Sequence, residues 1–148
     1  NGAETAAFGY LFNECLHGNS TCVRALREGT VVKSGWQDAS NEGRGAGWRV
    51  TVREADGGQT MYGHLTPNET PSVGTILDVN GEIANYASPT NGHSSGPHVH
   101  VQRWDSTGQI ISPGGLSPVQ SGTLRTPYQQ VDSLHPYGHQ GEDYVAPR

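Results

Sequence analysis

Two histidines, His98 and His100, are separated by one residue in the segment SGPHVHVQ. On an extended strand, side chains two positions apart project to the same face, so the two imidazoles can converge on one object. An imidazole nitrogen is a common zinc ligand, and an imidazole that titrates near neutral pH can also transfer protons. The spacing therefore indicates a metal site, a catalytic site or both on one face of this strand.

A zinc-dependent hydrolase needs about three protein ligands and one open position for water. The C-terminal segment HQGED contains an H-x-x-x-D pattern formed by His139 and Asp143. Together with His100, these residues offer two nitrogens and one carboxylate as ligands. His98 and, in the segment MYGHL, His64 are then candidates for accepting a proton and stabilising the developing oxyanion.

The remaining histidines show no spacing that marks them as ligands. The chain has seven histidines, so an H-x-H pattern arises easily by chance and its context must support it. We expect ordinary surface or hydrogen-bonded side chains at the other three positions: His17, His93 and His135.

The elements that must position these residues are predicted to be strands. Residues 48–53 alternate between apolar and polar side chains, and Asp56-Gly57-Gly58 breaks this pattern before a second strand. The pattern predicts a β-hairpin with His64 near the end of its second strand. Asn80-Gly81 has similar turn chemistry, so a further hairpin is expected within residues 72–88.

Other segments give weaker signals. A β-branched run after Gly29 predicts a strand, and residues 22–28 are compatible with a helical turn. Residues 105–134 are mostly Ser, Thr, Gly, Pro and Gln, which favours a loop or linker. Residues 1–18 are expected to form an additional N-terminal strand or an ordered arm.

Composition restricts the fold class and the partners. A chain of 148 residues is expected to form a single domain, and its 21 glycines and 9 prolines favour short strands and tight turns in an all-β fold. The net charge of -5 comes with scattered lysines and arginines, so nucleic acid is not an expected partner. The sequence contains no run of about 18 apolar residues, so no membrane span is expected.

The two cysteines, Cys15 and Cys22, bracket the polar segment LHGNST. This spacing predicts a small disulfide loop in an oxidising compartment. Two free thiols are the alternative. A zinc site that uses both thiols with His17 is a further alternative, although it offers only two sulfur ligands.

Taken together, MYGHL, SSGPHVHVQ and HQGED resemble the three signatures of the M23 peptidases. These are the lysostaphin and LytM type zinc metalloendopeptidases, which cut peptide bonds in bacterial peptidoglycan. The resemblance covers residues 25–104 and 139–147. It implies an antiparallel sheet that forms a groove with zinc at its floor. It also implies the following roles: zinc ligands at His100, His139 and Asp143, and catalytic histidines at His64 and His98.

The order of the motifs differs from the usual order in this family. There the H-x-x-x-D element comes first, whereas in this chain His139 and Asp143 come last. We therefore expect a circularly permuted domain whose two ends lie close together. Two alternatives remain: a domain swap, in which the C-terminal segment completes the site of a neighbouring chain, and an accidental match of the motif.

The resemblance implies a zinc metalloendopeptidase that acts on peptidoglycan peptides and is secreted, periplasmic or phage-associated. The alternative is a catalytically silent domain of the same fold, acting as a wall-binding, activating or structural module. The presence of all five site residues favours the enzyme. The sequence does not indicate which peptide bond is cut.

Overall fold

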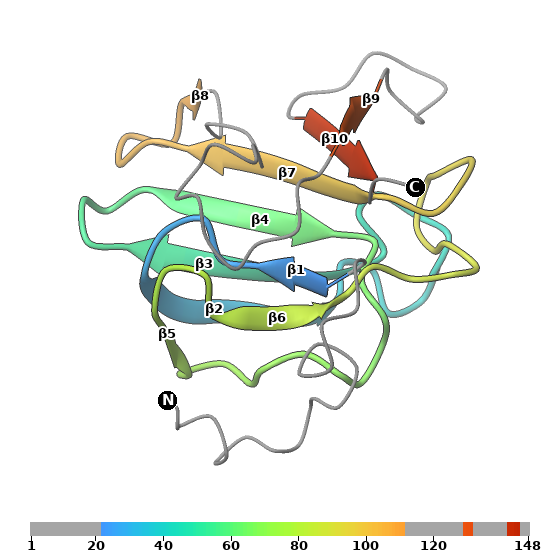
Figure 1. Ribbon diagram of the computed structural model, residues 1–148, viewed down its shortest axis with the longest axis horizontal. Coiled ribbons are helices and arrows are strands. Elements are labelled where there is room, and N and C mark those ends of the chain that lie inside the picture. Colours follow the sequence, from blue (N-terminus) through green and yellow to red (C-terminus); the bar gives the residue numbers. More distant parts are fainter. Residues whose placement is uncertain (1–21, 112–128, 132–141, 146–148) are drawn as a thin grey trace.

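The computed structural model describes residues 22–111, 129–131 and 142–145, which form only strands, turns and loops (Figure 1). No helix occurs in these ranges, as expected for an all-β fold. The strands are β1 (Cys22–Arg24), β2 (Gly29–Trp36), β3 (Trp48–Glu54), β4 (Gln59–Gly63), β5 (Ile76–Leu77), β6 (Glu82–Asn85), β7 (Val99–Trp104), β8 (Ile110–Ile111), β9 (Gln129–Val131) and β10 (Glu142–Val145).

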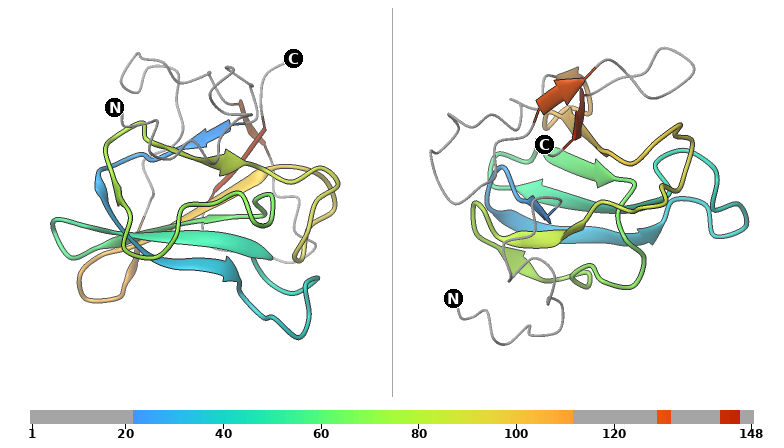
Figure 2. Two further views of the ribbon diagram at one scale, coloured as in Figure 1. Left: turned by 90° about the horizontal axis from the view of Figure 1, so that it is seen from below. Right: turned by 45° about the vertical axis from the view of Figure 1, so that its right-hand side comes forward.

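Eight of these strands form one antiparallel sheet in the order β5-β2-β3-β4-β7-β10-β9, with β8 also paired to β7. The other two, β1 and β6, form a small antiparallel sheet. The small sheet lies over one face of the large sheet, as both views in Figure 2 show. The fold therefore has two layers, with the core between them.

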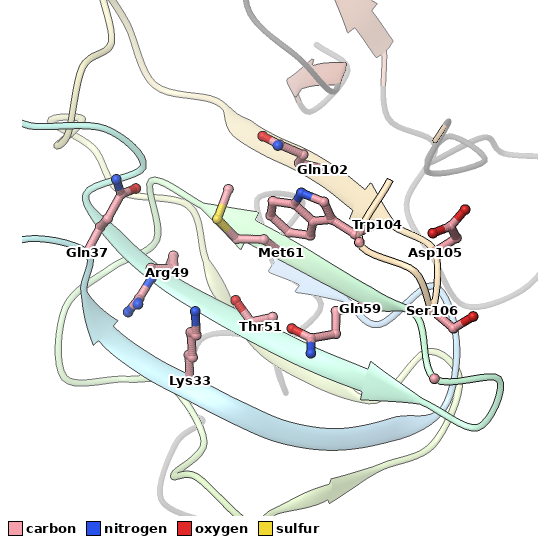
Figure 3. A pocket seen from close by; sticks show the side chains of 12 residues that line it. Lys33, Gln37, Arg49, Thr51, Gln59, Met61, Gln102, Trp104, Asp105 and Ser106 are labelled. Carbon is pink, nitrogen blue, oxygen red and sulfur yellow. The ribbon is translucent and has the colours of Figure 1, made fainter. Parts of the chain in front are cut away.

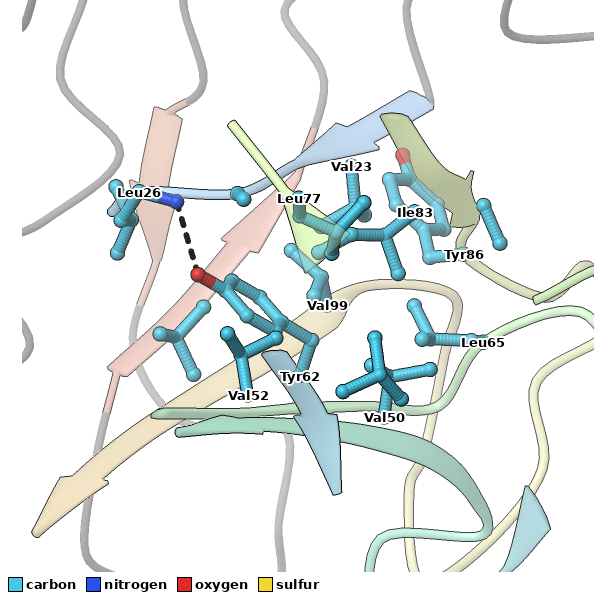
Figure 4. Packing of buried hydrophobic residues seen from close by; sticks show 14 residues of the cluster. Val23, Leu26, Val50, Val52, Tyr62, Leu65, Leu77, Ile83, Tyr86 and Val99 are labelled. Atoms are coloured by element: carbon cyan, nitrogen blue, oxygen red, sulfur yellow. Dashed lines mark hydrogen bonds between the residues drawn. The ribbon is translucent and has the colours of Figure 1, made fainter. Parts of the chain in front are cut away.

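The core is built by the side chains that alternate toward the small sheet. Val50 and Val52 of β3 and Val99 and Val101 of β7 are fully buried, and so is Tyr62 of β4 (Figure 4). Each fully buried valine contributes roughly 1.5–3 kcal/mol through removal of apolar surface from water. The other residues of β3 and β7 must then face away from the core.

Tyr62 also joins the layers through a polar contact. Its hydroxyl accepts a hydrogen bond from the backbone N–H of Leu26 at 2.9 Å (Figure 4). A buried phenol needs such a partner, because an unsatisfied polar group costs free energy in the interior. This bond fixes the segment after β1 against the strand that ends beside His64.

The structure confirms the first predicted hairpin and corrects two other expectations. β3 and β4 pair across the turn at residues 55–58, with Arg53 opposite Gln59. The helical turn expected over residues 22–28 is wrong, because β1 occupies its first part and pairs with β6. The expected hairpin around Asn80-Gly81 is also wrong: the chain turns there, but β5 pairs with β2 while β6 pairs with β1.

The turn at Asn80 directs the chain from one layer to the other. The N–H of Asn80 donates to the carbonyl of Ala25 at 2.8 Å, which holds this turn against the end of β1. Local turn chemistry thus predicted the reversal but not the partners of the two strands. The N-terminal arm expected over residues 1–18 lies outside the described residues.

Two short strands lie in the range predicted to be a loop or linker. Residues 105–109 form a tight turn in which Oδ1 of Asp105 accepts three hydrogen bonds, and this turn brings β8 back beside β7. β9 pairs with β10 at the edge of the large sheet. Residues 112–128 between them lie outside the described part of the chain.

Candidate functional site

His64, His98 and His100 come together at one end of the strand pair β4–β7. His64 directly follows β4, His98 directly precedes β7, and Gly63 lies opposite His100 in the ladder. The ring centroid of His64 lies 4.6 Å from that of His98 and 6.2 Å from that of His100. All three side chains are buried. Because three imidazoles in one buried cluster are uncommon, this is the candidate site.

The backbone of His64 has an unusual conformation. Its φ of 62° lies in the left-handed region, which costs a residue with a Cβ about 1–2 kcal/mol. Two hydrogen bonds hold it there: its N–H donates to the carbonyl of Ala46 at 2.7 Å, and its carbonyl accepts from the N–H of Ala87 at 2.8 Å. Strain held in this way is typical of functional residues.

The rings of His64 and His98 are held in the same tautomer. Nδ1 of His64 lies 2.7 Å from the carbonyl oxygen of Asn91, and Nδ1 of His98 lies 2.8 Å from the carbonyl oxygen of Gly96. A carbonyl oxygen can only accept, so each Nδ1 must carry the proton. In the neutral rings, Nε2 therefore carries the lone pair that can take up a proton.

His100 has the opposite arrangement. Its Nε2 lies 3.3 Å from Oε1 of Gln102, which is two residues further along the same face of β7. Donation from Nε2–H to this amide oxygen leaves the lone pair of the neutral ring on Nδ1. A ring that is oriented through its second nitrogen is typical of histidines that bind metals. His98 and His100 thus share a strand face but present different nitrogens.

Asn91 anchors the loop that leads to His98, and sequence analysis did not identify it. Its side chain donates from Nδ2 to the carbonyl of Leu65 at 2.9 Å and accepts from the N–H of Trp48 at 3.2 Å. Its own carbonyl accepts the proton of His64. A Cβ added at Gly47, where φ is 66°, would collide with Oδ1 of Asn91. The position in a Thr-Asn-Gly turn was the only sequence signal for this role.

The two C-terminal site residues are described only in part. His139 lies outside the described residues. The backbone of Asp143 lies in β10, directly opposite His100 in the antiparallel ladder with β7 of the same chain. Within the described ranges, no three His, Cys, Asp or Glu side chains form a group that could hold a metal. The metal site with His139 and Asp143 therefore stays a prediction.

The remaining expectations concern residues around the site. His93 is exposed, while His17 and His135 lie outside the described residues. Cys22 is buried at the start of β1, but Cys15 is outside the described part, so their disulfide stays a prediction. No helix among the described residues has the length and apolarity needed to cross a membrane.

A cavity of about 540 Å³ opens on the face of the large sheet that points away from the core (Figure 3). The residue that relates it to the histidine cluster is Gln102, which contacts His100 and also lines the cavity. Its other lining residues are mainly polar or cationic and include Lys33, Arg49, Thr51, Gln59, Met61 and Trp104.

Comparison with known proteins agrees with this arrangement of strands. The chain matches the model of Peptidase family M23 over residues 15–113, a range that contains His64, His98 and His100 and ends before His139. A solved structure with a similar fold is a mutant catalytic domain of the prophage-encoded M23 protein EnpA from Enterococcus faecalis. Its identity is 24% and its TM-score 0.53, and the match covers 65% of this chain and 69% of that one.

The catalytic domain of the antimicrobial peptidase lysostaphin from Staphylococcus simulans is also similar. It is 30% identical with a TM-score of 0.48, and the match covers 58% of this chain and 59% of that one. The chain thus spans about three fifths of that domain.

Proposed function

Because the chain belongs to peptidase family M23, we propose that it is a zinc metalloendopeptidase that hydrolyses peptide bonds in bacterial peptidoglycan. The observation that carries this proposal is the different presentation of the three histidines. His64 and His98 are anchored through Nδ1 and offer Nε2, whereas His100 is anchored through Nε2 and offers Nδ1. One ring suited to bind a metal thus lies beside two rings suited to move protons.

The residues proposed to hold zinc are His100, His139 and Asp143. This set of two imidazoles and one carboxylate is typical of catalytic zinc sites that keep one position open. The tautomer of His100 fits the role, and the register that sets Asp143 opposite His100 supports it. Zinc in this site would polarise the scissile carbonyl and lower the pKa of the attacking water.

His98 and His64 are proposed to carry the proton and stabilise the developing negative charge. Nε2 of one neutral ring accepts the proton of the attacking water, and a protonated Nε2–H of the other donates to the oxyanion. The short distance between the two rings allows both to contact the same tetrahedral centre. Their burial excludes bulk water and strengthens these interactions.

We propose further that the domain is circularly permuted and that its site is completed within one chain. The family match ends at residue 113, while β10, which contains Asp143, pairs with β7 beside the histidine cluster. This register supports completion by the same chain over a domain swap. The proposed place of action is outside the cytoplasm, in a secreted, periplasmic or phage-associated protein, where a disulfide between Cys15 and Cys22 would persist.

The rival proposal is a catalytically silent domain that binds the wall, activates another enzyme or has a structural role. The test is the release of free amino groups from purified peptidoglycan by the zinc-supplemented protein. Release that is abolished by a chelator and by His98→Ala supports the enzyme. Binding to peptidoglycan with no release of amino groups supports the silent domain instead.

A further inference from the structure

The open face of the large sheet carries two cations, Arg49 and Lys33, on the strands β3 and β2. We propose that the cavity over this face is a subsite in which Arg49 and Lys33 bind a free carboxylate of the peptide substrate. This inference rests on the proposed function, and it adds the chemical class of peptide that the site selects. Figure 3 shows both side chains rising from β3 and β2 beside the cavity.

The strand register connects this subsite to the histidine cluster. Gln102 of β7 lies opposite Met61 of β4, and Met61 lies opposite Thr51 of β3. Thr51 in turn lies opposite Lys33 of β2. Three steps between strands span about 14 Å, which corresponds to about four residues of an extended peptide. A peptide cleaved beside His100 could therefore extend across the sheet and bring an acidic group to Lys33.

Arg49 lies two residues from Thr51 on the same strand face and opposite Gly35 of β2. Its Nη1 donates to the carbonyls of Gly35 and Trp36 at 3.0 and 3.4 Å, which hold the guanidinium at the edge of the cavity. These contacts use only one of its two terminal nitrogens. The planar guanidinium is therefore positioned to bind a carboxylate through its remaining donors.

The charges around the cavity favour an anion. Arg49 is half-buried, and this burial lowers the pKa of its guanidinium from the ordinary value, which reflects the cost of a charge removed from water. Neither Arg49 nor Lys33 has an acidic partner among the described residues. A carboxylate ligand would supply the missing opposite charge.

One acidic residue, Asp105, also lines the cavity. Its carboxylate accepts hydrogen bonds from the hydroxyl and N–H of Thr107 at 2.6 and 2.9 Å and from the N–H of Gln109 at 3.0 Å. The hydroxyl of Thr107 is the main reason why the pKa of Asp105 is lowered. Asp105 keeps its charge, but its carboxylate is held within its own turn and forms no ion pair with Arg49 or Lys33.

The other lining residues suit a peptide backbone. Gln59 and Gln102 offer amide donors and acceptors, and Met61 and Trp104 offer apolar surface beside them. A nucleic acid is a poorer match, because only two cations line the cavity in the described part of the chain and the net charge is -5. The combined chemistry selects an extended peptide that carries a carboxylate.

The test compares purified peptidoglycan with the same material after its free carboxylates have been converted to amides with carbodiimide and ammonia. For the wild-type protein we expect kcat/KM to be about tenfold higher on the native material, because amidation removes one charge-assisted contact with the substrate. Lys33→Gln should reduce this preference, and the double variant with Arg49→Gln should abolish it. Arg53→Gln is the matched control, because Arg53 is an exposed arginine on the same strand that does not line the cavity.

A binding measurement separates failure of the subsite from failure of the proposed function. The zinc-loaded His98→Ala protein is sedimented with native or amidated peptidoglycan, which requires no turnover. Preferential binding to native material that depends on Lys33 and Arg49 supports the subsite even if no bond is cut. Equal hydrolysis of both materials by the wild-type protein, together with equal binding of both by the His98→Ala protein, would overturn the subsite and leave the proposed function standing. Because Lys33 is exposed, Lys33→Gln tests the idea without a risk to folding.

Discussion

The imidazole rings of His64 and His98 lie 4.6 Å apart, and each donates its Nδ1 proton to a backbone carbonyl of the loop between β6 and β7. This one loop therefore sets the tautomer of both rings. It contributes the carbonyls of Asn91 and Gly96, and it ends at His98 itself. Changes that loosen the loop should affect the proposed chemistry without removing either histidine.

Asn91→Ala tests the role of this loop. The variant loses the hydrogen bonds to Leu65 and Trp48, so we expect a loss of about 1–2 kcal/mol in the free energy of unfolding. It should also lower kcat more than it changes KM, because the acceptor for His64 is displaced. Urea unfolding and steady-state kinetics measure both effects. Asn41→Ala, in an exposed loop, is the control, and equal kinetics for the two variants would contradict this role.

The positive φ of His64 gives a prediction about stability. At most positions glycine is less favourable than alanine, but in the left-handed region alanine pays a steric cost that glycine avoids. We therefore expect His64→Gly to be more stable than His64→Ala by about 1 kcal/mol. Both variants should lack turnover. A chemical denaturation series compares them, and a more stable alanine variant would show that the backbone is not strained there.

Gln102→Leu tests the proposed metal role of His100. The substitution removes the acceptor that fixes the ring, and loss of such a partner typically weakens metal binding about 10-fold to 100-fold. Competition with a chromogenic chelator measures zinc affinity independently of activity. Gln59→Leu, which also lines the cavity, is the control. Identical zinc affinity in both variants would argue against orientation of His100 by Gln102.

Mixing two inactive variants distinguishes permutation within one chain from a domain swap. His64→Ala and Asp143→Ala change the two different chain segments that a domain swap would separate. If each site is completed by its own chain, unfolding and refolding the two variants together restores no activity. If the C-terminal segment belongs to a neighbouring site, mixed dimers contain one intact site, and a substantial part of the activity returns.

Local sequence patterns predicted the parts of the fold that depend on neighbouring residues. The β3–β4 hairpin followed from alternation and from the Asp-Gly-Gly turn, and the shared face of His98 and His100 followed from strand geometry. The pairing of β5 with β2 and of β6 with β1 did not follow, because partners distant in the chain are chosen by core packing. A turn at Asn80-Gly81 is compatible both with a β5–β6 hairpin and with the observed pairing of these strands to β2 and β1.

The candidate site was predictable to a similar extent. Residue types and a family resemblance indicated His64, His98 and His100, but the sequence did not predict which ring nitrogen each would offer. That property depends on the carbonyl of Asn91 and the amide of Gln102, which reach the rings only in the folded structure. The contact made by the backbone carbonyl of Asn91 could not be predicted from residue type, since every residue has a backbone carbonyl.

Zinc content and turnover, measured on the same samples, distinguish the role of His98 from that of His100. We expect about one zinc per chain in the wild-type protein and in His98→Ala, with turnover of peptidoglycan only in the former. We expect loss of both zinc and turnover in His100→Ala. A folded wild-type protein that binds no zinc, or a His98→Ala variant that keeps full turnover, would contradict these roles.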